Sequence, residues 1–179
     1  MNRKQILEAT RKSINELVLD FQNNKFDYLS ESDIKIKLVH LLKEKIDVYI
    51  HNADSEKSPI HIVKSEYPYP NTVSAYQKLD IAILHPQSPT PGSNLWQLPI
   101  FIAIELKYSI DKRKDKSFLN DIQKINSIKD CSRVALHFSR FPIKDSFDVL
   151  NTIEVFKKNN YFVIDDDKVY RLTNIEVIK

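Results

Sequence analysis

The sequence predicts a single α/β domain in which helices flank a central mixed β-sheet. Two helical patterns open the chain, strand patterns rich in isoleucine, valine and aromatic residues follow, and a further helix separates two of the strands. The chain has 179 residues, of which 42% are apolar, enough to bury one substantial core. It contains one glycine, which excludes the glycine-rich loops that bind nucleotide phosphates.

The first two elements are predicted to be amphipathic helices. In residues 5–21 apolar side chains recur at spacings of three and four, so that they share one helix face. A polar break at residues 22–25 ends this helix. Ser30 then serves as the N-cap of a second helix with acidic residues in its first turn, which ends near Ile46.

The middle of the chain predicts an antiparallel meander of four strands. The segment after the third strand contains three prolines and Gly92, so it is expected to be a loop, too short for a crossover helix. The strands on either side of it should therefore pair antiparallel, with Gly92 marking the turn. The four predicted strands are residues 47–51, 60–67, 79–85 and 99–107.

The last part of the chain continues the α/β pattern. A helix is predicted for residues 117–129, followed by a strand at 133–139 whose continuous apolar sequence indicates burial on both faces. Because a helix precedes it, this strand should lie parallel to the one that ends at Lys107. A helix at 145–158 and a hairpin of residues 161–164 and 169–172 complete the prediction.

Two acidic residues stand out at the ends of apolar strands. Asp80 opens one strand and Glu105 closes the next, and these ends lie side by side in an antiparallel pair. Lys107 follows two residues later on the same face of its strand as Glu105. Facing like charges need a positive neighbour, and carboxylate oxygens suit Mg²⁺ or Mn²⁺. The three side chains thus predict a site for a divalent ion.

This pattern resembles the PD-(D/E)xK phosphodiesterase superfamily, the restriction-endonuclease-like nucleases. Asp80 and Glu105-Leu106-Lys107 match its motif, with Leu79 where the family name has proline, and residues 30–140 resemble its αβββαβ core. The helix before this core and the helix and hairpin after it would be additions. The resemblance implies that Asp80, Glu105 and the Leu106 carbonyl hold Mg²⁺ or Mn²⁺, while Lys107 acts at the attacking water or scissile phosphate.

Further residues are candidates on the same grounds. Glu31 fits the acidic residue that many family members place in the helix before the sheet, and Glu66 ends a strand near the same edge. Each is a candidate metal ligand, but a helix-start acid and a strand-end acid are also common in proteins without such a site. The candidates for contact with nucleic acid are Lys112, Arg113, Lys114, Lys116 and Lys124.

The expected function is that of a metal-dependent endonuclease acting on DNA, with RNA as another substrate that the sequence leaves open. The alternative is a non-catalytic module that keeps the fold and binds nucleic acid or a protein, its acids forming a surface rim. A homodimer is expected if both strands of a duplex are cut. The net charge of +3 favours neither function, and the five histidines lack the spacing of metal ligands. The lone Cys131, with no signal or membrane segment, indicates the cytoplasm.

Overall fold

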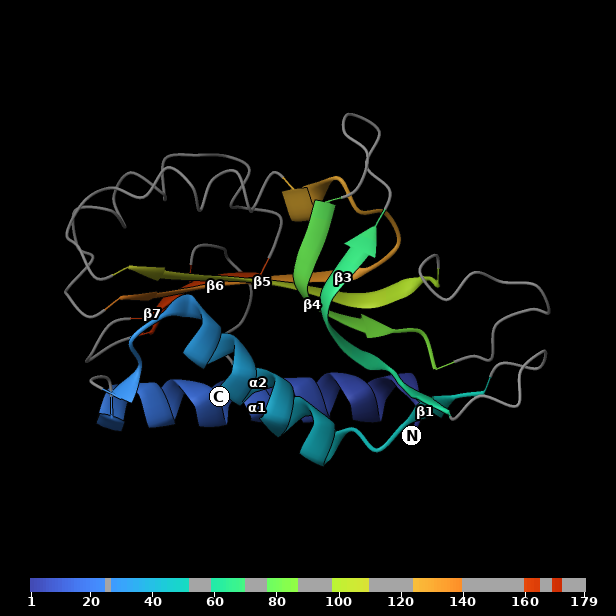
Figure 1. Cartoon of the computed structure of the whole chain (residues 1–179), viewed down its shortest axis with the longest axis horizontal. Coiled ribbons are helices and arrows are strands. Elements are labelled where there is room, and N and C mark those ends of the chain that lie inside the picture. The colour runs from blue at the N-terminus through green and yellow to red at the C-terminus, as the bar shows by residue number, and fades with distance from the viewer. Residues whose placement is uncertain are drawn as a thin grey trace.

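The computed structural model describes residues 1–24, 27–51, 59–69, 77–86, 98–109, 124–139, 160–164 and 169–171. It is a mixed α/β structure, as predicted. Two long helices, α1 (Arg3–Asn24) and α2 (Glu31–Lys45), pack together on one side of the main sheet (Figure 1). No helix in the described part of the chain is both long and apolar enough to cross a membrane.

The start of α2 is determined by local hydrogen bonds. Ser30 is the N-cap: its hydroxyl accepts the backbone NH of Asp33, and the Asp33 carboxylate accepts the backbone NH of Ser30 in return. This capping box satisfies two NH groups that the first helical turn leaves without partners. It confirms the predicted N-terminus, and it places Glu31 in the first turn of the helix, beside the sheet.

The main sheet is mixed, and among the described residues it has six strands in the order β3-β4-β5-β6-β7-β8. β3, β4 and β5 pair antiparallel, β5, β6 and β7 pair parallel, and β8 is antiparallel to β7. The two pairings that the sequence predicted on either side of β5 are thereby confirmed. The strands are β3 (Val63–Tyr69), β4 (Gln77–Leu84), β5 (Ile100–Ser109), β6 (Ser132–Ser139), β7 (Asn160–Ile164) and β8 (Val169–Arg171).

The predicted four-strand meander is wrong in its first member. Only Tyr49–Ile50 of that segment forms a strand, β1, and it pairs with β2 (Ile60–His61) in a separate two-stranded sheet. Ile62 causes the change: its NH bonds to the Val48 carbonyl, while its own carbonyl accepts the NH of Leu84 in the main sheet. The predicted strand 60–67 is therefore divided between two ladders at Ile62.

Aromatic side chains join the helical layer to the sheet. Phe21 of α1 has no exposed surface, and its ring centroid lies 5.0 Å from Phe138 of β6, 5.5 Å from Tyr28 and 6.3 Å from Tyr108 of β5. Tyr108 also donates its hydroxyl to the Tyr28 carbonyl at 2.7 Å. Tilted and edge-to-face contacts of this kind add to the stabilisation from burial alone. We call these four residues the aromatic junction.

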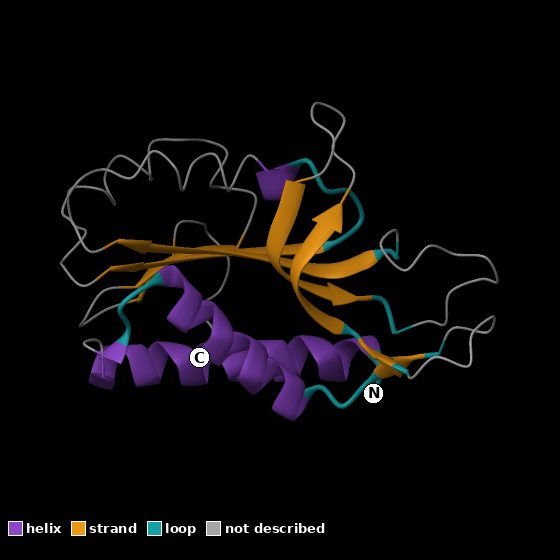
Figure 2. Ribbon diagram, viewed as in Figure 1, coloured by secondary structure: helices purple, strands orange, loops and turns teal. Residues whose placement is uncertain are grey.

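Several predicted features lie wholly or mostly outside the described residues. These are the loop with Gly92, the helix at 145–158 and most of the helix at 117–129. Of that last helix, residues 124–126 are described as helical, and Figure 2 shows them on the opposite side of the sheet from α1 and α2. Helical segments thus lie on both sides of the sheet in the described structure.

Candidate functional site

The candidate site lies where the ladders around β4 are interrupted. The β3–β4 ladder skips one position, that of Glu66 and Asp80, and resumes on the next pair. The β4–β5 ladder stops at Ile81 and Ile104, one position before Asp80 and Glu105. If the register is continued by one position, Asp80 lies opposite Glu105, which is the alignment that the sequence predicted. It also places Glu66, Asp80 and Glu105 in a row across three neighbouring strands.

Carboxylates occupy the space beyond the end of the β4–β5 ladder. Asp80 Oδ2 accepts the backbone NH of Leu106 at 2.9 Å, and Glu31 Oε2 accepts that of Tyr108 at 3.3 Å. These NH groups belong to β5 past its last pair with β4. In Figure 1, β3 and β4 curve away from the plane of β5 and β6. Where the strands separate, side-chain carboxylates thus accept the hydrogen bonds of backbone NH groups that lie past the last β4–β5 pair.

Each acid at this place also contacts a lysine. Lys35 of α2 forms ion pairs with Glu66 and, at 3.5 Å, with Asp80 Oδ1. Lys107 Nζ lies 3.6 Å from Glu31 Oε2, and Lys124 Nζ lies 2.7 Å from Glu105 Oε2. We call this group the charged fork; it consists of Glu31, Lys35, Glu66, Asp80, Glu105, Lys107 and Lys124.

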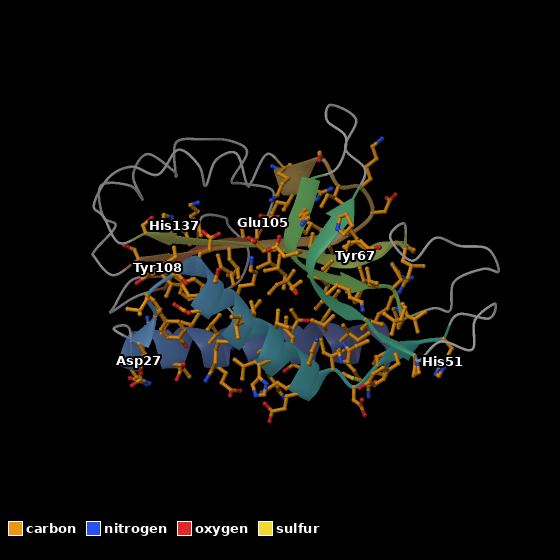
Figure 3. All side chains as sticks on the ribbon, viewed as in Figure 1. Asp27, His51, Tyr67, Glu105, Tyr108 and His137 are labelled. Carbon is orange, nitrogen blue, oxygen red and sulfur yellow. The ribbon has the colours of Figure 1, made fainter. Side chains whose placement is uncertain are left out.

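Burial differs across the charged fork. The Glu105 side chain is 1% exposed and that of Asp80 is 15% exposed, whereas Glu66 is 48% exposed. Figure 3 shows Glu105 on the central part of the sheet. Lys124 reaches Glu105 from the helical segment after β5 and also donates to the Lys78 carbonyl at 2.9 Å. A carboxylate as buried as Glu105 needs such a charged partner.

Glu66 has an unusual backbone conformation. Its φ angle is +51°, in the left-handed region that residues other than glycine seldom adopt. Such a conformation is costly and persists where surrounding contacts enforce it, as happens at functional sites. Here it coincides with the skipped position in the β3–β4 ladder and with the contact between Glu66 and Lys35. The candidate status of Glu66 therefore has structural support beyond its place at a strand end.

The carboxylate oxygens of this site are the kind of ligand that a hard divalent ion prefers. Mg²⁺ is bound by oxygen ligands, commonly one or two carboxylates with water completing the shell, and Asp80 and Glu105 provide carboxylates. Within the ranges that the structure describes, however, no three His, Cys, Asp or Glu side chains are grouped so that they could hold a metal ion. Asp80 and Glu105 contact different lysines. The Leu106 NH donates to Asp80 Oδ2 in this site.

The residues predicted to contact nucleic acid have different outcomes. Lys124 is engaged with Glu105 in the charged fork. Lys112, Arg113, Lys114 and Lys116 lie outside the described residues.

Two residues near the site escaped the sequence analysis. Lys35 follows Glu31 by four positions and so shares its helix face, a spacing that could have singled it out. His137, one of the five histidines without metal-ligand spacing, is 4% exposed and aligned with Lys107 across the β5–β6 ladder. Its Nε2 lies 2.7 Å from Ser109 Oγ. Only the register between these two strands reveals that position.

Comparisons of the chain with models of protein families, with curated proteins and with solved structures find no match.

Proposed function

We propose that the chain is a metal-dependent nuclease that hydrolyses phosphodiester bonds of DNA, on a restriction-endonuclease-like αβββαβ core. The observation that carries this proposal is the interruption of both ladders at Asp80, where Glu66, Asp80 and Glu105 align across β3, β4 and β5. Beside them, Lys107 of β5 pairs with Glu31 of α2. Apart from β1 and β2, which form a separate small sheet between α2 and β3, the described elements follow the order α2, β3, β4, β5, a helical segment and β6, which agrees with such a core.

In this proposal each side chain has a defined task. Asp80 and Glu105 would hold Mg²⁺ or Mn²⁺ with the Leu106 carbonyl, and Glu31 and Glu66 would complete or support that shell. The bound ion supplies Lewis-acid stabilisation of the phosphate and lowers the pKa of a water molecule. Lys107 places a positive charge beside the scissile phosphate, where negative charge grows in the transition state. Glu31, 3.6 Å from the Lys107 ammonium, orients that side chain.

The second candidate is a non-catalytic module that binds nucleic acid or a protein. It is favoured by one observation, the pairing of each acid in the charged fork with a lysine, because such pairing is also what a neutralised surface rim would show. The two candidates differ in whether Asp80 and Lys107 are needed for cleavage, which an assay can decide.

The test is cleavage of single-stranded DNA, double-stranded DNA and RNA with Mg²⁺ or Mn²⁺. Replacement of Asp80→Asn keeps an acceptor for the Leu106 NH but removes the charge, and Lys107→Met removes the ammonium. Each should slow DNA cleavage by about 10²–10³-fold, the range for losing one electrostatic contact to a transition state. Glu16→Gln is the matched control, because Glu16 pairs with Lys45 at 2.7 Å and neither residue belongs to the charged fork.

The fold of each variant is checked by thermal unfolding. If the unaltered chain cuts no substrate with either metal, or if both variants cut as fast as it does, the nuclease proposal is wrong. Metal-independent binding of DNA without cleavage would identify the second candidate instead. Faster cleavage of RNA than of DNA would correct the substrate.

A further inference from the structure

Lys35 of the charged fork forms ion pairs with two carboxylates. It lies one helical turn after Glu31 on α2, and its ammonium contacts Glu66 on β3 and Asp80 on β4. The side chain is 18% exposed and Asp80 is 15% exposed, so this contact is mostly shielded from solvent. Lys35 thus stands between two acids that occupy one skipped position of the ladder.

Without a cation, these two acids would destabilise the sheet. Like charges directly opposite each other on neighbouring strands repel, and the repulsion grows as the site is shielded from water. The Lys35 ammonium, in contact with Glu66 and 3.5 Å from Asp80 Oδ1, supplies that cation.

The backbone of Glu66 adds to this argument. A φ angle of +51° in the middle of a strand requires contacts that hold the residue there. The ion pair with Lys35 is the contact that the Glu66 carboxylate makes in the described structure. Lys35 thereby keeps the Glu66 carboxylate near Asp80 although the ladder is broken at both residues.

We propose that Lys35 is a positioning residue that takes the place of the divalent ion: it holds Glu66 and Asp80 together in the ion-free protein and is displaced when the ion binds them. This inference rests on the proposed function, because it requires that an ion binds at Asp80. The ammonium and a doubly charged ion repel each other strongly at contact distance, so both cannot occupy the space between the same two carboxylates.

Two opposite effects of removing the charge follow. Ion binding becomes tighter, because the ion no longer competes with a resident cation. The ion-free protein becomes less stable, because Glu66 and Asp80 lose their counter-ion. A lysine with a purely structural role would produce the second effect without the first, so the affinity for the ion distinguishes the two roles.

The experiment measures Mn²⁺ binding by calorimetry, and thermal unfolding in EDTA and in Mn²⁺. In Lys35→Gln the Kd for Mn²⁺ should fall about tenfold or more, as expected for removal of a charge at contact distance. Its Tm in EDTA should fall, and its rise on adding Mn²⁺ should exceed that of the unaltered chain. Lys35→Arg keeps the charge and should keep the weaker binding.

The matched control is Lys37→Gln, on the same helix. Lys37 pairs with Asp20 of α1 at 3.5 Å, outside the charged fork, so its loss should leave the Kd for Mn²⁺ unchanged. If Lys35→Gln does not fold in EDTA, Glu66→Gln is compared with the double variant Lys35→Gln/Glu66→Gln, in which the repulsion with Asp80 is relieved. Tighter Mn²⁺ binding by the double variant supports the proposal.

The possible failures are distinct. If the unaltered chain binds Mn²⁺ and Lys35→Gln binds it equally or more weakly, Lys35 does not stand in for the ion, while the proposed metal site survives. If neither protein binds Mn²⁺, the metal-dependent function itself is wrong and this inference falls with it. Binding by Lys35→Gln alone supports the proposal, since it shows a site that the lysine blocks.

Discussion

The aromatic junction and the charged fork both connect the helical layer to the sheet, but they do so by opposite means. In the aromatic junction, Phe21 contacts three rings at centroid distances of 5.0–6.3 Å and is wholly buried. These ring contacts are apolar, so they require no charged or hydrogen-bonding partner. They stabilise the fold through burial and dispersion.

The charged fork shares only strand β5 with the aromatic junction, and it is costly by comparison. Placing Asp80 and Glu105 in shielded positions removes them from water, and their ion pairs with Lys35 and Lys124 offset that cost only in part. Apolar side chains of similar volume would stabilise such a place equally well or better. The difference teaches that the aromatic junction is explained by stability alone, whereas the charged fork requires a reason beyond stability.

The largest expected effect on stability comes from the aromatic junction. Replacement of Phe21→Ala should lower the free energy of unfolding by about 3–5 kcal/mol, because it leaves a cavity among three rings. Denaturant titration measures this change. Since Phe21 makes no contact in the charged fork, the cleavage rate per folded molecule should stay the same. A loss of cleavage in fully folded protein would show that the two regions are coupled.

A smaller effect is expected from Tyr67, which follows Glu66 on β3 but points into the apolar interior (Figure 3). Burial raises the pKa of its hydroxyl to about 12. The neutral hydroxyl donates to the Leu98 carbonyl at 3.3 Å. An unfolded tyrosine loses its proton near pH 10, so between pH 10 and 12 the unfolded state binds fewer protons than the folded state. The free energy of unfolding must therefore fall as the pH rises through this range.

Between pH 10 and 12 the Tyr67 hydroxyl should reduce the free energy of unfolding by on the order of 2 kcal/mol, and Tyr67→Phe should abolish this reduction. Urea titrations of both proteins at pH 9 and at pH 11.5–12 measure the difference in slope. The comparison between the two proteins is essential because burial and Asp20 also raise the pKa of Tyr28, which contributes equally to both. Equal pH dependence of the two proteins would contradict the prediction.

The smallest effect sharpens the contrast at Glu66 itself. Glycine adopts a φ of +51° without the steric cost that other residues bear, so Glu66→Gly should be more stable than Glu66→Ala by about 1 kcal/mol. Both variants lack the carboxylate and should lower nuclease activity to the same degree. Thermal unfolding and the cleavage assay together check this. An alanine variant as stable as the glycine variant would mean that the backbone of Glu66 is not strained.

Much of the fold could be predicted from local patterns. The capping box at Ser30 is a local signal, and the start of α2 matches it. The short proline-rich segment after β4 implied the antiparallel pairing with β5, and the helix before β6 implied the parallel pairing. The division of the predicted strand at Ile62 could not be predicted, because its two hydrogen bonds go to Val48 and Leu84, distant in sequence.

The site shows the same limit. Asp80, Glu105 and Lys107 could be selected because charged residues at the ends of apolar strands are conspicuous in a sequence. Their partners could not: Lys35 and Glu66 are 31 residues apart, and Lys124 approaches Glu105 from a later segment. Lys124, a predicted contact for nucleic acid, forms an ion pair with Glu105, the most buried acid of the charged fork. Which lysine pairs with which acid depends on how α2 and the strands pack.

The sequence by itself determined the α/β class and the pairings on either side of β5, and it drew attention to Asp80, Glu105 and Lys107. Periodicity, caps and loop length act over short distances along the chain. Only the tertiary structure decided that both ladders break at Asp80, that Glu66 turns into the left-handed region there, and that Lys35 bridges the two acids. These features arise between elements brought together by packing, where repulsion and burial act across space rather than along the sequence.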